Sequence, residues 1–335
     1  SNKPNDNIPQ KIEEKTDGTL ALQDSQDSQT NWFEYDGTTL LKLKEKYRDY
    51  KGAICIPERV TSINDYAFKG CANLTSITIP DNVKNIGYSA FEGCTGLTSI
   101  TIGSSVKNIN RYAFARCSSL TFVTIPNSVV SIENGAFAWC TELVKITIST
   151  RVKRLANGVF EGCRKLTSIV IPNGVKKIAK DAFYSCDGLK SITIPDSVET
   201  IGRNAFAGSR SQTEVHISNL AKWCNIQSSS VSLWKGKLFL GDTLVTDLFI
   251  PEGVRNINRY AFAGCKSIHS LTIPKSVVCI HCLAFSNCEN LENITVIGSN
   301  DVYHSEENCL IEIENRILVL GCKKSTIPDD GSVTS

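Results

Sequence analysis

The sequence lacks several features that identify common classes of protein. Its 36 lysine and arginine residues are nearly balanced by 34 aspartate and glutamate residues, so the formal net charge is only +2. No apolar run approaches the roughly 18 residues that a membrane-spanning helix needs. There is also no glycine-rich phosphate loop, and no serine has a recognisable catalytic partner. We therefore expect no nucleic-acid partner, no cofactor and no enzymatic activity.

Histidine is scarce, and the four histidines share no carboxylate or cysteine at a repeated offset. The strongest local pattern for a metal or redox site is Cys279-Ile280-His281-Cys282. No second pair of ligands accompanies it in the sequence, and Ile280 occupies a position expected to face inward. We therefore predict that the chain holds no metal.

Methionine is absent, and the chain begins at Ser1 without an apolar leader segment. We interpret it as a mature or trimmed form. Residues 1–30 contain hardly any apolar side chains and are rich in Asp, Gln, Ser and Lys. Such a segment cannot bury enough surface to offset the entropy of ordering it. We predict a disordered tether over 1–30.

What the chain does contain is one 23-residue phrase, most clearly at residues 77–99, ITIPDNVKNIGYSAFEGCTGLTS. Seven copies run end to end over residues 54–214, and two more occupy residues 248–293. The departures are few, and two of them replace the proline of the phrase, with Gly103 and Ser149. A fixed period of this length is typical of a solenoid built from stacked coils.

The apolar positions within the phrase predict two short extended segments per coil. Leu97, Ile100 and Ile102 have the spacing of a strand with one buried face, and a proline such as Pro80 ends that strand. The valine and isoleucine that follow predict a second inward-facing extended segment. The Ala-Phe-x-x-Cys stretch after it predicts one tight helical turn.

One coil has about eight inward side chains and cannot bury them alone, so coils must stack at the strand spacing of roughly 4.8 Å. We predict a β-rich, right-handed solenoid of stacked short parallel strands joined by short helical turns. Residues 31–53, which begin with an aromatic cluster at Trp32, Phe33 and Tyr35, are predicted to form an N-terminal cap over the first full coil.

The phrase resembles the leucine-rich repeat of the BspA-like type, which occurs in bacterial and some protozoan surface proteins. The residues that carry the resemblance are I-x-I-P-x-x-V-x-x-I-x-x-x-A-F-x-x-C-x-x-L, and they cover residues 54–293. The resemblance implies a leucine-rich-repeat solenoid and an extracellular or bacterial cell-surface location. In a surface lipoprotein the tether would follow a lipidated cysteine upstream of Ser1, and we expect membrane attachment only through such an anchor.

Cysteine is abundant, but its positions do not indicate a disulfide scaffold. Eight of the fourteen occupy one position of the repeat, namely Cys71, Cys94, Cys117, Cys140, Cys163, Cys186, Cys265 and Cys288. A repeated inward position favours small, buried, unpaired thiols that behave as hydrophobic side chains. The cysteine count therefore says little about the redox compartment.

Two segments depart from the period. Residues 215–247 are too apolar for a disordered loop and are predicted to form an expanded coil or insertion, with a hairpin turn at 235–237. Alternatively, this segment protrudes and presents the aromatic side chains of Trp223 and Trp234. Residues 294–335 are predicted to form a longer coil, with strands near 308–311 and 318–322, and then the start of a further repeat. We expect the full-length protein to continue beyond it.

Two ladders of side chains are expected on the surface. The position between the two isoleucines of the first strand is threonine in most copies and should line the strand face. Residues 142–190 contain ten basic and four acidic side chains, which suggests an electropositive strip for an anionic partner. The candidate binding residues are Lys107, Lys153, Arg154, Lys176, Lys177, Trp223 and Trp234.

We therefore predict a non-enzymatic module that binds a protein or an anionic polymer in cell-surface adhesion or host interaction, and that is a monomer. One alternative is a structural spacer that displays a downstream domain. Another is carbohydrate binding through the tryptophans of residues 215–247. Every repeated feature is explained by stacking, so the repeat itself does not identify a ligand.

Overall fold

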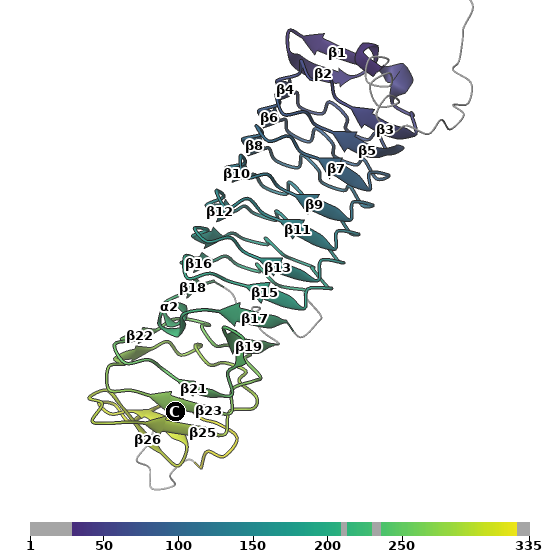
Figure 1. Cartoon of the computed structure of the whole chain (residues 1–335). Coiled ribbons are helices and arrows are strands. Elements are labelled where there is room, and N and C mark those ends of the chain that lie inside the picture. The colour runs from purple at the N-terminus through teal and green to yellow at the C-terminus, as the bar shows by residue number, and fades with distance from the viewer. Residues whose placement is uncertain (1–28, 209–212, 230–235, 327–335) are drawn as a thin grey trace, which may run out of the picture.

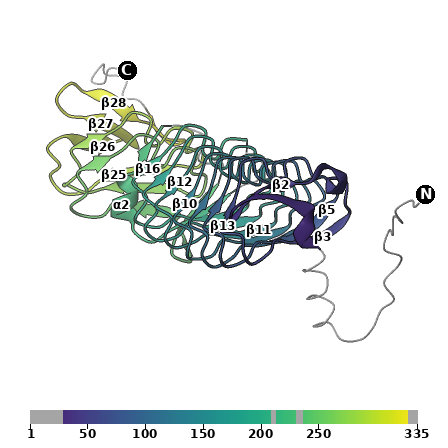
Figure 2. The ribbon, with the colours of Figure 1, turned by 90° about the horizontal axis from the view of Figure 1, so that it is seen from above.

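The computed structural model describes residues 29–208, 213–229 and 236–326, which form one elongated stack of coils (Figure 1). Seen obliquely from above, successive coils overlie one another (Figure 2). Equivalent residues of neighbouring coils are hydrogen-bonded neighbours, so that Ile54 pairs with Ile77 and Ile77 pairs with Ile100. The predicted solenoid of stacked parallel strands is confirmed.

The first strand of each coil contributes to one long face of the stack, which we call the first strand column. Leucine, isoleucine or valine side chains face inward from it, and the outward side chains are most often serine or threonine. Its strands are β3 (Gly52–Cys55), β5 (Leu74–Thr78), β7 (Ser99–Thr101), β9 (Phe122–Thr124), β11 (Lys145–Thr147), β13 (Ser168–Val170), β15 (Ser191–Thr193), β17 (Glu214–Ile217), β19 (Lys237–Leu240), β21 (Asp247–Phe249), β23 (Ser270–Ile273) and β25 (Asn293–Val296).

The second strand of each coil is only two residues long, with one side chain outward and one buried. These strands form the second strand column. They are β4 (Ser62–Ile63), β6 (Asn85–Ile86), β8 (Asn108–Ile109), β10 (Ser131–Ile132), β12 (Arg154–Leu155), β14 (Lys177–Ile178), β16 (Thr200–Ile201), β18 (Gln227–Ser228), β22 (Asn256–Ile257) and β24 (Cys279–Ile280).

Strand pairing breaks in both columns at the same two places along the stack. One sheet ends at β10 and the next begins at β12, while in the first column pairing stops at β11 and resumes at β13. Both columns break again before β21 and β22. The coils on either side of the first break remain joined by backbone hydrogen bonds in the turns, such as the 3.0 Å bond from Phe137 N–H to the Val159 carbonyl.

The segment after the second strand, which we call the turn edge, is not a helical turn as the sequence suggested. Ala90, Glu92 and Cys94 each donate a backbone hydrogen bond to the residue three positions earlier. The bonds do not continue as a helix, because the chain passes through left-handed backbone at Ser89 (φ 50°) and again at Gly93 (φ 74°). The turn edge is therefore a series of tight turns.

The phenylalanine of each turn lies inside the stack, with its ring on the ring of the next coil. The rings of Phe91 and Phe114 are 5.0 Å apart between centroids and lie within 1° of parallel. The stack runs from Phe68 to Phe206 and contains its widest step, 6.0 Å, between Phe137 and Phe160. That step coincides with the first break in strand pairing.

Seven of the eight cysteines of the column are buried, as predicted, and Cys288 is half-buried. The column also has a role beyond filling space. The thiol of Cys94 donates to the carbonyl oxygen of Phe68 in the preceding coil at 3.2 Å. The same bond links Cys117 to Phe91 at 3.2 Å. It recurs at Cys140, Cys163, Cys186 and Cys288. Each thiol thus gives a buried backbone carbonyl an additional hydrogen-bond donor, which an alanine or valine could not do.

A hairpin lies at the N-terminal end of the described chain. Strands β1 (Phe33–Asp36) and β2 (Thr39–Leu43) are antiparallel, and β2 then pairs in parallel with β4. Two short 3-10 helices, η1 (Thr30–Trp32) and η2 (Glu45–Tyr47), flank the hairpin, and the rings of Trp32 and Tyr47 stack at 4.6 Å.

The described parts of the segment 215–247, residues 215–229 and 236–247, stay within the stack. Strand β17 pairs in parallel with β15 and β19, and the short helix α2 (Leu220–Cys224) forms one corner of the coil. Of the hairpin turn predicted at 235–237, Lys235 lies outside the described residues, and Lys237 lies in β19 (Lys237–Leu240) rather than in a turn. The hairpin joins β19 to β20 (Thr243–Leu244), with Gly241 in left-handed backbone at the turn.

The C-terminal strands exist near the predicted positions, but they do not form a coil of the solenoid. Strands β26 (Tyr303–Glu306), β27 (Cys309–Glu312) and β28 (Ile317–Leu320) make a three-stranded antiparallel sheet. The short connections between them allow the chain only to reverse direction, which accounts for the difference. Within the described residues, no helix has the length and apolar character required to cross a bilayer.

Candidate binding surface on the second strand column

The predicted basic residues are positioned by the two-residue strands of the second column. Leu155 and Ile178 are completely buried, so they fix the orientation of the residues before them. Arg154 and Lys177 therefore point outward and are directly paired across β12 and β14. The period of the repeat sets this alignment, because each side chain lies beside its equivalent in the next coil.

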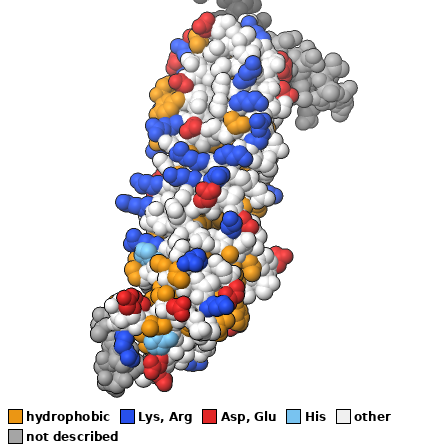
Figure 3. Space-filling view, turned by 90° about the vertical axis from the view of Figure 1, so that its left-hand side faces the viewer, with side chains coloured by type: hydrophobic (Ala, Val, Ile, Leu, Met, Phe, Trp, Pro, Cys, Tyr) orange, Lys and Arg blue, Asp and Glu red, His pale blue; other side chains and the backbone are white. Residues whose placement is uncertain are grey.

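Lys153 and Lys176 form a second row beside the first. The backbone N–H of Lys176 donates to the carbonyl of Lys153 at 2.9 Å, so these residues are neighbours in adjacent coils. All four side chains are exposed. We call Lys153, Arg154, Lys176 and Lys177 the basic strip, and Figure 3 shows lysine and arginine side chains gathered across the middle of this face.

Lys107 does not belong to this cluster, although the sequence grouped it there. Val130 occupies the equivalent position in the intervening coil, with its N–H bonded to the Lys107 carbonyl. The first break in strand pairing also separates β8 and β10 from β12. Arg151 is instead a nearby exposed cation that the sequence did not single out, and alternation about the buried Val152 could have indicated it.

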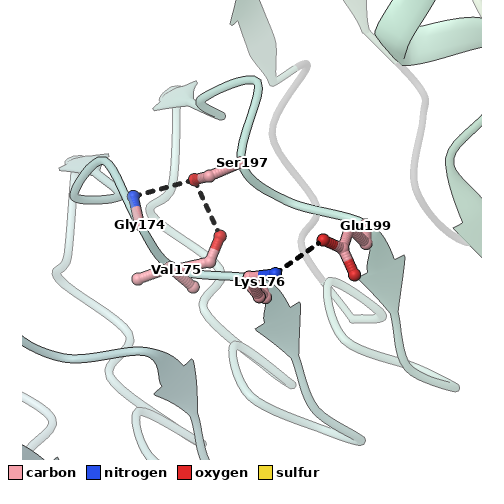
Figure 4. A network of polar contacts seen from close by, with 5 residues as sticks. All are labelled: Gly174, Val175, Lys176, Ser197 and Glu199. Atoms are coloured by element: carbon pink, nitrogen blue, oxygen red, sulfur yellow. Dashed lines mark hydrogen bonds and ion pairs between the residues drawn. The ribbon is translucent and has the colours of Figure 1, made fainter.

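One carboxylate forms an ion pair with the basic strip, at the end of the strip nearer the C-terminus. Lys176 Nζ lies 3.1 Å from Glu199 Oε1 in the next coil, and both side chains are about two-thirds exposed, at 67% and 66% (Figure 4). Beside this pair, the Ser197 hydroxyl accepts from Gly174 N–H and donates to the Val175 carbonyl, each at 2.9 Å. Such an exposed ion pair contributes little to stability.

The other three cations of the strip have no ion pair among the residues that the structure describes. Gly174 makes room for one of them, since a Cβ atom at that position would lie 2.9 Å from Lys153 Nζ. Like charges on paired strands are destabilising by tenths to about 1 kcal/mol. The fold therefore holds Lys153, Arg154 and Lys177 together, and none of the described carboxylates forms an ion pair with them.

Trp223 does not form the aromatic contact on the surface that the sequence offered as an alternative. Trp223 is buried, with 4% of its surface exposed, and its indole N–H donates to the Ala261 carbonyl at 2.8 Å. Asn219 caps the helix that carries it, accepting from Lys222 N–H. Trp223 is therefore a core residue that ties the expanded coil to a later one. Trp234 lies outside the described residues.

The threonine ladder lies on the outward face of the first strand column, as expected. Thr78 pairs with Thr101, and Thr124 pairs with Thr147. Val170, which is 67% exposed, interrupts the ladder, and the stacked rings of His216 and Phe239 replace threonine further along. The ladder is therefore not uniform in chemistry.

The fold brings no further metal-ligating side chain among the described residues to the Cys279-Ile280-His281-Cys282 pattern. Cys279 and Cys282 are exposed, and the Cys282 sulfur lies 3.6 Å from His281 Nδ1. Among the described residues, no three His, Cys, Asp or Glu side chains are grouped as they would need to be to hold a metal ion.

Comparison with solved structures finds similar bacterial proteins. A leucine-rich repeat protein from Treponema pallidum is 28% identical, with a TM-score of 0.47, over 51% of this chain and 83% of that one. A leucine-rich repeat protein from Bacteroides ovatus is 26% identical, with a TM-score of 0.44, over 78% and 85%. A leucine-rich cell surface protein from Faecalibacterium prausnitzii is 26% identical, with a TM-score of 0.33, over 80% and 92%.

No curated protein matches the chain. The family comparison is more informative, because it covers nearly all the coils. The BspA type leucine-rich repeat region matches residues 51–167, 107–232 and 235–319, which together span well over half of the sequence. The repeat phrase, the two strand columns and this match agree, and the chain therefore belongs to the BspA type leucine-rich repeat family.

Proposed function

We propose that this chain is a non-catalytic binding module that holds an anionic partner, a polymer or an acidic protein, on the basic strip. The observation that carries the proposal is the direct pairing of Arg154 with Lys177, flanked by Lys153 and Lys176, on a rigid exposed face. The arrangement adds nothing to folding, because like charges repel across the strands. An anionic partner would supply the missing counter-charge.

The lattice of the solenoid suits such a partner. Successive coils repeat at roughly 4.8 Å, so the cations sum to a local positive potential that the net charge of +2 conceals. A partner could follow the strip along the axis of the stack. Display of this face by a monomer on a bacterial cell surface is part of the proposal, and membership of the BspA type family supports it.

The test compares two variants with the same change in net charge. The strip variant carries Lys153→Glu, Arg154→Glu and Lys177→Glu. The control carries Lys145→Glu, Lys190→Glu and Lys237→Glu, which are exposed cations in or next to the first strand column. Heparin serves as the anionic probe.

We expect wild type and control to be retained on a heparin column and to elute together. The strip variant should elute at markedly lower salt, because exposed charges act through a field that salt screens over about 8–10 Å at physiological ionic strength. Circular dichroism and thermal unfolding check that all three proteins are folded. Equal retention of the strip variant and wild type, or no retention of either, would reject the strip as the binding surface.

A further inference from the structure

Each turn edge has a left-handed backbone position two residues after the phenylalanine, and each except the one at Ala284-Phe285 has another just before the Ala-Phe or Val-Phe pair. Glycine and the short polar residues are the ones that tolerate this conformation best. Such residues fill it in most coils: Ser89, Gly135, Gly158, Asp181 and Asn204 at the first position, and Gly70, Gly93, Gly162, Ser185, Gly208, Gly264 and Asn287 at the second.

Bulky side chains occupy these positions mainly in the N-terminal coils. Tyr66 (φ 60°) and Tyr112 (φ 57°) are at the first position, and Arg116 (φ 60°) and Trp139 (φ 62°) are at the second. A bulky residue with left-handed backbone is an outlier that points to a role other than folding. Tyr260 is a further case, but it is 94% buried, at 6% exposure, so packing accounts for it.

The two tyrosines in the N-terminal coils are far less buried than Tyr260, although the ring of Tyr112 lies against Gly135 of the next coil. Tyr66 is 49% exposed and Tyr112 is 38% exposed. Tyr88 lies between them in the intervening coil, and its ring meets theirs edge to face, at 5.2 Å from Tyr66 and 6.1 Å from Tyr112. Three coils thus present a continuous row of aromatic rings to solvent.

Cations accompany the row. Lys69 lies over the Tyr66 ring and is paired with Glu92 at 2.9 Å, so its charge is already matched. Arg111 lies over the Tyr112 ring, 5.8 Å from its centroid. Arg111 and Arg116 are exposed, and neither forms an ion pair within the described part of the chain. Arg116 is close enough to Glu92 to help Lys69 lower the pKa of that carboxyl. The surface therefore combines exposed tyrosine rings with two guanidinium groups that are not held in an ion pair among the described residues.

We propose that this tyrosine edge, made of Tyr66, Tyr88, Tyr112, Arg111 and Arg116, docks a carboxylate-bearing segment of a partner protein. Tyrosine and arginine are the residue types that dominate the energetics of protein interfaces. Guanidinium groups bind carboxylates through two parallel hydrogen bonds, and charge complementarity selects an acidic segment. The tyrosine edge lies on the turns and the basic strip on the second strand column, so the two surfaces act independently.

Substitutions at the left-handed positions allow a test in which affinity for the partner should fall while thermal stability stays the same or rises. The edge variant carries Tyr66→Asn, Tyr112→Asn and Arg116→Gly, each a residue that other coils use at that position. The control carries Ser185→Gly and Asn287→Gly, at the second position of coils outside the tyrosine edge. The probes are peptides selected from a displayed random library on the full wild-type chain.

We expect acidic peptides among those selected, and about tenfold or greater weakening of their Kd on the edge variant by fluorescence anisotropy. The control and the strip variant should bind them as wild type does. The Tm of the edge variant should be unchanged or higher, because strained backbone has been relieved.

Three results would overturn the proposal. Selected peptides that bind the edge variant as tightly as wild type place the contact elsewhere, and loss only in the strip variant assigns it to the basic strip. Selected peptides without Asp or Glu contradict the predicted chemistry of the partner. A lowered Tm in the edge variant would show that the tyrosines stabilise the fold, which removes the argument from strain.

Discussion

At the scale of single residues, the phenylalanine column contributes the largest side chains of the core. Phe91 is fully buried, and its ring lies 4.9 Å from that of Phe68 and 5.0 Å from that of Phe114. Neither neighbour can collapse into the space that a smaller residue would leave, because Phe68 also packs edge to face on Phe33 and Phe114 is also stacked on Phe137. A change at one such position therefore affects three coils.

We expect Phe91→Ala to lower the free energy of unfolding by roughly 3–5 kcal/mol, through lost burial and the cavity left behind. Urea unfolding followed by circular dichroism measures it. Phe122→Ala is the matched control, because Phe122 is 61% exposed and should cost little. A loss below about 1 kcal/mol at Phe91 would contradict the packing described here.

The cysteine column makes stability depend on alkaline pH. Burial raises the pKa of the Cys140 and Cys288 thiols from 9.0 to about 12 and that of Cys71 to about 11. Between pH 9 and those values the unfolded chain loses the thiol protons and the folded chain keeps them. Because the unfolded state then binds fewer protons, stability falls as pH rises through this window.

The size of this effect can be measured with one substitution. Each fully protected thiol contributes a slope of at most about 1.4 kcal/mol per pH unit above pH 9. In Cys140→Ala the free energy of unfolding should therefore fall less steeply between pH 9 and 11 than in wild type, although its value at pH 7 should be lower because a buried S–H donor is lost. Parallel pH profiles of the two proteins would exclude the buried-thiol account.

At the scale of the repeated element, proline marks where the first strand column is well paired. Before a proline, the isoleucine N–H donates to a backbone carbonyl of the next coil, as from Ile79 to Thr101 at 2.9 Å and from Ile125 to Thr147 at 2.8 Å. Where Gly103 or Ser149 replaces the proline, the described structure shows no such bond from Ile102 or Ile148.

We expect the amides of Ile102 and Ile148 to exchange with solvent deuterium at least about tenfold faster than those of Ile79 and Ile125. The four residues occupy the same position of the repeat, so the second pair serves as an internal control. Exchange measured by NMR at neutral pH resolves the individual amides. Equal protection at all four would show that the ladder is continuous across both departures.

The strand columns could be predicted because the inward-facing strand positions of the repeat carry apolar residues in every copy. The turn edge could not, because Tyr66 and Tyr112 carry no sign in their residue type that their backbone is left-handed. The thiol bonds were also missed, since a cysteine in an inward position gives the same pattern whether or not its S–H donates.

The binding surface was predictable in part for the same reason. The 23-residue period aligned Arg154 with Lys177, but it could not reveal the break that separates Lys107 from them. Trp223 was ambiguous, because a tryptophan in an irregular segment produces the same sequence signal whether it is buried or exposed. The low exposure of Trp223 and its bond to Ala261 show that it is buried.

At the scale of the whole molecule, the two coincident breaks divide the stack into blocks. A solenoid is stabilised by contacts between neighbouring coils, so its stability is approximately a sum of coil and interface terms. An interface that lacks strand pairing in both columns contributes less to this sum. The stack from β1 to β11 should therefore be able to lose structure separately from the C-terminal coils.

Phe91→Ala tests this division, because Phe91 lies well inside the N-terminal block. In the variant, hydrogen exchange followed by mass spectrometry should show lost protection over β4 to β11 and nearly unchanged protection over β21 to β25. The reason is that the destabilisation passes between coils only through their interfaces, and both breaks lie between the two regions.

Phe285→Ala, in the last stacked pair of rings, is the reciprocal variant and should leave the protection of β4 to β11 unchanged. Equal loss along the whole chain in either variant would mean that the turn-edge hydrogen bonds across the first break, such as Phe137 to Val159, are sufficient to make the solenoid one cooperative unit.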